Sequence, residues 1–431
     1  MALYSNEQLA PLVRTQGRTW FDAQTGGIWF NWTCAGFTIT FTGKTLRARL
    51  LAFGDEVPGP PGTETPIDYP CVGVVAEDGE TLSARMKCTG GPKWYELFHG
   101  EEGTHTLGLR KLSENMRGKT ALLALETDGE VLPAQEGEKK LTIEFVGDSI
   151  TCGFGNEAPD RDSLFETSEE NGWMTYGAVA ARELGAEFNM ISVSGISTAP
   201  GKHPFIPMKQ MNEVYPFTDV YCDERLDKEP AAWDFANHHK DIVAINLGTN
   251  DVNPVRFAKD TATADEEEAW FSVNYRAFLE KVRELNGPDT TILCTLGSMD
   301  YYLFDHIKEV VEQYKKDTGD QKVHCFKYIG INLMTCLLYT SGRGTVKFQR
   351  IFSKVFHGAP HKSPRPKSTN PYTTEAVMPY TSTGPATVNS LAPRPVINPS
   401  LLNSKAGDTL ELAKPVMGTS IPAPACLARL S

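Results

Sequence analysis

Hydrophobic and polar positions follow two different periods along the chain. In residues 1–135 they alternate within short runs, such as Phe37 to Phe41 and Leu46 to Leu50, which places the apolar side chains on one face of a strand. Turn residues separate the runs, among them Asp78-Gly79 and Asp128-Gly129. Short strands at this spacing predict a β-sandwich over residues 1–135.

Residues 136–330 alternate instead between apolar runs and helical patterns. Trp173 to Leu184 and Asp265 to Leu285 have apolar residues at helical spacing. The acidic run Asp265 to Glu268 predicts that the second helix begins there, since the helix dipole favours negative charge at its start. Alternating strands and helices indicate an α/β/α domain with a mostly parallel sheet. The expected strands are residues 141–147, 187–193, 241–247, 290–296 and 322–328.

The composition changes near residue 331. Residues 331–431 contain 11 Lys and Arg but 3 Asp and Glu, and 12 of the 28 prolines of the chain. Prolines cannot continue a helix or a central strand, so we expect a basic, proline-rich tail with little order. Residues 336–341 resemble translated adapter sequence. Our hypothesis is that the tail is frameshifted or chimeric; a genuine disordered extension is the alternative.

Overall composition narrows the class of partner. A formal net charge of −12 argues against nucleic acid, and no apolar run approaches the ~20 residues of a membrane span. Residues 1–7 lack the features of a signal peptide. The nine cysteines are an odd number without metal-site spacing, which predicts free thiols in a reducing compartment. We therefore expect a cytoplasmic protein without a nucleic-acid or membrane partner.

Candidate chemistry lies where three expected strands end. Ser149 follows the first strand, within the run Gly-Asp-Ser-Ile-Thr, while Gly195 and Asn250 follow the next two. Reactive groups of open α/β sheets gather at this edge. A serine hydroxyl becomes a nucleophile when a base takes its proton, and attack on an ester creates an oxyanion that needs fixed donors. The Ser149 N–H, the Gly195 N–H and the Asn250 amide would supply three.

Structural interpretations of the same residues stay open. Ser149 is also compatible with an ordinary turn between a strand and a helix, and Asn250 with a turn former. Trp173 and Tyr176 lie three residues apart and are predicted core residues, with a platform for a sugar ring as the alternative. Residues 200–232 are expected to be a long loop near the reactive edge. Aromatic residues of this segment that would line a sugar cleft are Phe205, Tyr215 and Tyr221.

The three segments that contain Ser149, Gly195 and Asn250, here called blocks, follow one another in this order and resemble those of the SGNH (GDSL-type) hydrolases. With the β-rich residues 1–135 before them, the chain resembles carbohydrate esterase family 2, whose members pair a jelly-roll-like β-sandwich with an SGNH domain. Residues 103–111 and 233–235 add to the resemblance. It implies an esterase that removes O-acetyl groups from xylan-type or related oligosaccharides through an acyl-serine intermediate, without a metal or an organic cofactor.

The chain departs from the family at its catalytic histidine. The family pairs the serine with a histidine in a loop after the last strand, commonly as Asp-x-x-His. After Tyr328 the only histidines are His357 and His361, and neither sequence context matches that pattern. Three functions stay open: an acetyl esterase, a carbohydrate-binding protein that has lost catalysis, and another SGNH esterase acting on lipid or aryl esters.

Overall fold

The computed structural model describes residues 1–56, 66–134, 140–159, 165–202, 208–297 and 299–328. All of them belong to one compact unit of the chain, Met1–Ala359. The predicted tail, with His357 and His361, lies outside the described residues. Within them, no helix has the length and apolar character needed to cross a membrane.

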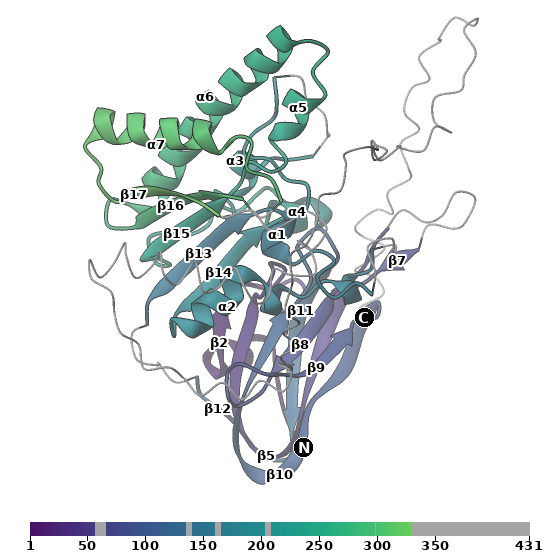
Figure 1. Ribbon diagram of the computed structural model, residues 1–431. Helices are drawn as coiled ribbons and strands as arrows, with labels where there is room; N and C mark the ends of the chain where they lie inside the picture. Colours follow the sequence, from purple (N-terminus) through teal and green to yellow (C-terminus); the bar gives the residue numbers. More distant parts are fainter. Residues whose placement is uncertain (57–65, 135–139, 160–164, 203–207, 298, 329–431) are drawn as a thin grey trace, which may run out of the picture. The chain divides into compact units, whose positions relative to one another are not determined.

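The N-terminal part is a sheet of ten antiparallel strands (Figure 1). Its apolar positions alternate as predicted, because Phe37, Ile39 and Phe41 are buried while Thr38 and Thr40 are half-buried. Leu46, Ala48 and Leu50 repeat this pattern. The strands are β1 (Ala2–Ser5), β2 (Val13–Gln16), β3 (Trp20–Asp22), β4 (Gly27–Trp29), β5 (Gly36–Phe53), β8 (Cys71–Val75), β9 (Leu82–Lys87), β10 (Gly91–Lys111), β11 (Lys119–Thr127) and β12 (Val131–Leu132).

Two long strands organise this sheet. β5 and β10 pair along nearly their whole length. The order of strands in the sheet is β3-β4-β11-β5-β10-β8-β9. β1 pairs with β11, whereas β2 and β12 pair with the first half of β5. The predicted β-rich N-terminal domain is confirmed, and the strand pairs of this sheet are antiparallel. A separate short pair consists of β6 (Asp55–Glu56) and β7 (Ile67–Asp68).

The second part contains five parallel strands in the order β14-β13-β15-β16-β17. Each predicted strand is confirmed to within one residue at either end. The continuous apolar run from Ile242 to Ile245, in which every residue is buried, suits a strand that is covered on both faces. The strands are β13 (Thr142–Gly147), β14 (Glu187–Ser192), β15 (Ile242–Asn246), β16 (Thr291–Leu296) and β17 (Val323–Lys327).

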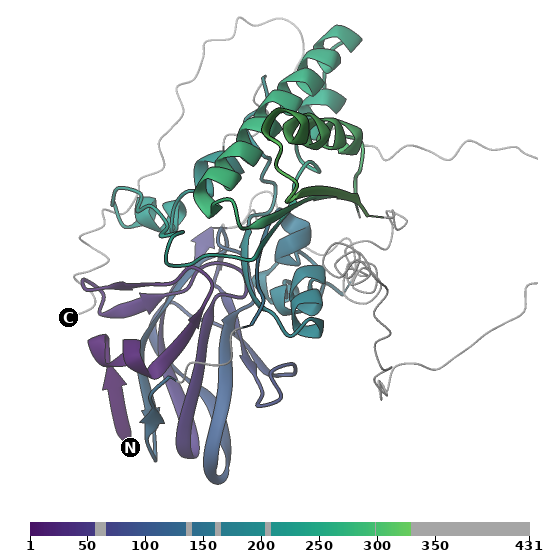
Figure 2. The ribbon, with the colours of Figure 1, turned by 90° about the vertical axis from the view of Figure 1, so that its left-hand side faces the viewer.

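Helices cover both faces of the parallel sheet (Figures 1 and 2). Phe145 shares a core cluster with α2, whereas the next residue, Val146, belongs to the cluster of α6 and α7. Successive side chains of a strand point to opposite faces, so one strand supplies both cores. The helices are α1 (Ser149–Cys152), α2 (Tyr176–Glu183), α3 (Met211–Val214), α4 (Val220–Arg225), α5 (Val252–Arg256), α6 (Thr261–Asn286) and α7 (Phe304–Thr318).

Two helix starts differ from the prediction. α6 begins at Thr261 and not at Asp265, because the Asp260 carboxylate accepts a hydrogen bond from the Thr263 N–H at 2.8 Å and caps the helix. The acidic run therefore lies one turn inside the helix. α2 begins at Tyr176, since Trp173 lies in a preceding 3-10 turn. Trp173 and Tyr176 are both buried, as predicted for core residues.

The expected long loop over residues 200–232 is wrong for its described part. α3 and α4 lie within it. Tyr215 does not line a cleft, because it is fully buried and its hydroxyl donates to the Glu144 carboxylate at 2.8 Å. Tyr221 is half-buried, and Phe205 lies outside the described residues.

A buried arginine joins the sandwich to the α/β part. The Arg18 guanidinium donates to the Tyr215 carbonyl at 2.6 Å and lies 3.4 Å from the Glu144 carboxylate of β13. It also lies within 5.4 Å of the ring centroids of Tyr215, Trp233 and Phe235. Arg18 is fully buried and Glu144 is 1% exposed. Each charge therefore depends on the other for compensation.

We expect Arg18→Ala to lower the free energy of unfolding by about 3–5 kcal/mol, because it leaves the Glu144 carboxylate buried without its cation. Urea unfolding at neutral pH measures this loss. Arg14→Ala is the matched control. Arg14 also pairs with a glutamate, Glu187, but both side chains are 40% exposed or more, and such pairs contribute about 0–1 kcal/mol. Equal losses for the two variants would contradict the prediction.

Candidate active site

Ser149 lies at the carboxyl end of β13, the strand between β14 and β15, where it begins the short helix α1. Asp148 caps α1, because its carboxylate accepts the Ile150 N–H at 3.0 Å. Only glycine fits at position 147, because a Cβ there would lie 2.0 Å from the Thr151 hydroxyl oxygen. The Gly-Asp-Ser-Ile-Thr run thus forms a tight strand-to-helix turn that presents a half-buried Ser149 side chain at the sheet edge.

Gly195 follows the neighbouring strand β14. Gly147 and Ser192 are partners in the parallel ladder, so Gly195 lies on the same edge as Ser149. Its φ of +81° is in the left-handed region that favours glycine. The N–H of the preceding residue, Ser194, donates to the Glu114 carboxylate at 2.5 Å.

Asn250 follows β15, on the other side of β13. Gly147 is paired there with Asn246. The Asn250 amide nitrogen donates one hydrogen to the Ile196 carbonyl at 2.9 Å. Because an amide NH₂ has two hydrogens, a second remains for another acceptor. Asp251 accepts the Thr198 N–H at 2.8 Å, so the loops after β14 and β15 are tied together twice.

The structure therefore brings the three predicted residues to three adjacent strand ends. Among the described residues, the Ser149 hydroxyl and the N–H groups of Ser149 and Gly195 have no hydrogen-bond partner. A free hydroxyl beside unpaired donors is the arrangement that acyl transfer requires.

Two buried carboxyl groups lie behind these loops. Burial raises the pKa of Asp148 to about 7, against the opposing effect of the Ile150 N–H. Burial also raises the pKa of Asp251 to about 7, where the Thr198 N–H opposes the shift and the Asp148 charge adds to it. Both groups therefore change protonation near neutral pH.

None of the described histidines has a hydrogen bond or an ion pair with Ser149. His238 and His239 are exposed, and His306 and His324 are half-buried. His203, His357 and His361 lie outside the described residues. The polar contacts of the described histidines are with Glu96 (His99), Glu77 and Glu101 (His105), Asp234 (His238), Thr290 (His239), and Ser272 and Glu268 (His306).

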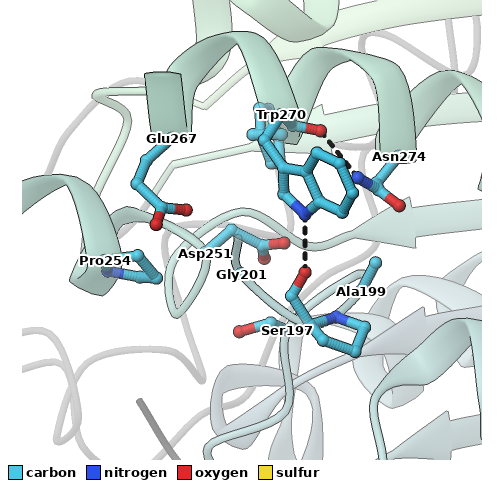
Figure 3. A pocket seen from close by; sticks show the side chains of 10 residues that line it. Ser197, Ala199, Gly201, Asp251, Pro254, Glu267, Trp270 and Asn274 are labelled. Atoms are coloured by element: carbon cyan, nitrogen blue, oxygen red, sulfur yellow. Dashed lines mark hydrogen bonds between the residues drawn. The ribbon is translucent and has the colours of Figure 1, made fainter. Parts of the chain in front are cut away.

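A small pocket adjoins the loops that tie the site together (Figure 3). Ser197 and Asp251 line one side, and Trp270 of α6 lines the other. The Trp270 side chain is 42% exposed, and its indole N–H donates to the Pro200 carbonyl at 2.9 Å. The sequence holds no signal that singles out Trp270, because one aromatic residue on a mostly polar helix face forms no pattern.

Three buried polar residues close to the Ser149 helix also gave no signal in the sequence. A carboxyl oxygen of Glu114, a carboxyl oxygen of Glu170 and the Cys152 sulfur lie within 4.8 Å of one another. The Lys111 ammonium donates to the Glu114 carbonyl, and the Arg117 guanidinium lies 3.6 Å from the Glu114 carboxylate. The Cys152 thiol donates to the Glu114 carboxylate and the Glu114 N–H donates to the Glu170 carboxyl, so hydrogen bonds join the three residues into one buried network.

Residues 145–326 match the GDSL-like Lipase/Acylhydrolase family. These residues contain the Ser149, Gly195 and Asn250 blocks. The chain therefore contains a region that matches the GDSL-type (SGNH) family model. The family predicted from the three strand ends is thereby confirmed for this part of the chain.

The relatives extend the likeness to the N-terminal sandwich. The chain is 33% identical over 232 residues to the cellulase/esterase CelE of Acetivibrio thermocellus. The aligned region covers 53% of this chain and only 26% of CelE. It is 23% identical over 352 residues to an acetylxylan esterase/glucomannan deacetylase of Cellvibrio japonicus, with 78% of this chain and 88% of the relative covered.

Solved structures agree with these relatives. A family two carbohydrate esterase from Clostridium thermocellum, in complex with cellohexaose, has a TM-score of 0.64 at 25% identity and covers 79% of this chain and 99% of its own. The order of a sandwich followed by an SGNH domain is confirmed. The relatives and neighbours are carbohydrate esterases, and they support the predicted class of carboxylic ester hydrolases.

We expect the stability of the protein to fall as the pH rises from about 4 to about 7. The raised pKa values mean that the folded protein keeps protons on Asp148 and Asp251 that the unfolded chain has released above about pH 4. Asp251→Asn removes one of these groups but keeps the oxygen that accepts from Thr198. The decrease in the free energy of unfolding between pH 5 and pH 8 should therefore shrink by about 2 kcal/mol.

Urea unfolding at several pH values measures this difference. Asp227→Asn is the control, because Asp227 is exposed and asparagine tolerates its positive φ of 54°. It should leave the pH dependence as in the wild type. Parallel stability curves for wild type and Asp251→Asn would contradict the assignment.

Proposed function

We propose that this protein is a serine esterase that removes O-acetyl groups from carbohydrates. The observation that carries the proposal is the meeting of Ser149, Gly195 and Asn250 on adjacent strand ends. The Ser149 hydroxyl has no partner among the described residues, and the Asn250 amide keeps one free hydrogen after its bond to Ile196. The carbohydrate esterases among the relatives and structural neighbours support the substrate class.

Each residue then has a defined role. The Ser149 oxygen attacks the acetyl carbonyl while a base takes the hydroxyl proton. The Ser149 N–H, the Gly195 N–H and the Asn250 amide donate to the oxyanion that forms. The sugar hydroxyl leaves with a proton from the base, and water then releases acetate from Ser149. The family resemblance implies a histidine base, and His357 and His361 are the first candidates to substitute.

The pocket beside Asp251 is the proposed place for part of the sugar. Trp270 lines it with an exposed ring face, and aromatic rings suit the apolar faces of sugar rings. Trp270 thus takes the place of Tyr215 as the aromatic residue of the proposed cleft.

We expect Ser149→Ala to abolish acetate release from acetylated xylo-oligosaccharide, because no acyl-enzyme can form. Asn250→Ala should lower kcat about 10²–10³-fold, the usual effect of removing one oxyanion donor. Acetate is measured enzymatically, and the unfolding midpoint of each variant verifies that it folds. Acetate release by Ser149→Ala at the wild-type rate would rule out the mechanism.

The same assay separates the alternatives. Sugar binding by calorimetry without acetate release from folded wild type would favour the carbohydrate-binding protein that has lost catalysis. Faster hydrolysis of long-chain than of short-chain p-nitrophenyl esters would favour an esterase that acts on lipids. Neither outcome agrees with the proposed acetyl esterase.

We expect Trp270→Ala to raise KM for the acetylated oligosaccharide about 10-fold and to leave kcat for p-nitrophenyl acetate unchanged, since loss of stacking on one ring costs about 1–2 kcal/mol. Phe257→Ala is the matched control, because Phe257 is an exposed aromatic residue that does not line the pocket. An unchanged KM in Trp270→Ala would remove this pocket from the proposed sugar site.

A further inference from the structure

One carboxylate of the β-sandwich part contacts both the serine block and the glycine block. Glu114 follows β10 and is fully buried. Its Oε2 accepts the Ser194 N–H at 2.5 Å, and the same oxygen lies 3.7 Å from the Cys152 sulfur, which donates to it. Ser194 precedes Gly195, and Cys152 ends the helix that begins at Ser149. The two blocks are therefore bridged by a residue outside the SGNH domain.

Glu114 is itself held on several sides. Its N–H donates to the Glu170 carboxyl at 2.8 Å, and its carbonyl accepts from the Lys111 ammonium. The Arg117 guanidinium lies 3.6 Å from the second carboxylate oxygen. Burial and the neighbouring Glu114 charge raise the pKa of Glu170 well above its usual range.

We propose that Glu114 is a positioning residue that fixes the oxyanion donors of the site. By accepting the Ser194 N–H, it holds the turn in which the next N–H, that of Gly195, stays unpaired and available to the substrate. Through Cys152 it keeps this turn in register with the helix that carries Ser149. This inference rests on the proposed esterase function, and Glu114 itself does not touch the substrate.

The geometry of the turn explains why such an acceptor is needed. A left-handed glycine has a wide choice of backbone angles, so the peptide before it rotates easily unless it is anchored. A buried N–H without an acceptor is strongly disfavoured and would draw the loop toward another partner. Preorganised donors stabilise a transition state only while their direction is fixed.

Three variants test the proposal. Glu114→Ala removes the acceptor, and we expect kcat for acetate release to fall about 10²-fold with KM changed less than about 3-fold, as for loss of an oxyanion donor. Glu114→Gln keeps an oxygen that can accept from Ser194, so kcat should recover to within about 10-fold of wild type. Glu144→Ala is the control, because Glu144 is an equally buried acid whose partners are Arg18 and Tyr215. It should lower stability but not kcat, measured below its unfolding midpoint.

Hydrogen exchange provides a readout that does not depend on catalysis. In the full chain, mass spectrometry of a peptide that spans residues 191–199 should show faster exchange in Glu114→Ala and wild-type exchange in Glu144→Ala. If wild type releases no acetate, the proposed function fails, but this comparison still decides whether Glu114 anchors the turn. Unchanged exchange in Glu114→Ala, or equal losses of kcat in Glu114→Ala and Glu144→Ala, would overturn the proposal.

Discussion

Parallel pairing of β13 with β14 on one side and β15 on the other is the constraint on which the candidate site depends. In a parallel sheet, all strands end at the same edge. Residues that follow different strands therefore meet there although they are far apart in the sequence. The ladder fixes the register, because Gly147 is paired with both Ser192 and Asn246. Hydrogen bonds between the loops, from Asn250 to Ile196 and from Thr198 to Asp251, then set the finer geometry.

A second constraint is the burial of polar groups where the sandwich meets the α/β part. Arg18 enters an environment of aromatic rings and backbone carbonyls and is compensated by Glu144. Asn31 donates to Asp219 at 2.7 Å, and the Trp32 indole donates to the Thr218 carbonyl at 2.8 Å. Such groups are costly to bury unless each meets its partner, so these contacts fix the geometry of the junction more sharply than apolar packing alone would.

The sequence predicted what depends on periodicity and on strand ends. The five parallel strands, the antiparallel domain and the placement of Ser149, Gly195 and Asn250 on one edge all follow from local patterns. The start of α6 differs from the prediction, because the hydrogen bond between the Asp260 side chain and the Thr263 N–H fixes it one turn before the acidic run. Burial of Tyr215, exposure of Trp270 and the contacts of Glu114 depend on tertiary neighbours distant in sequence. A single sequence holds no local signal for them.

The contacts of Arg18 have a consequence for how such a chain changes over evolutionary time. Arg18 belongs to the sandwich part, whereas its partners belong to the α/β part, so a sandwich taken from an unrelated protein would leave Glu144 and the Tyr215 carbonyl without their donor. Recombination at the boundary between the halves is thereby penalised, although each half has its own sheet. The two are expected to be inherited together and to diverge by paired substitutions at their junction.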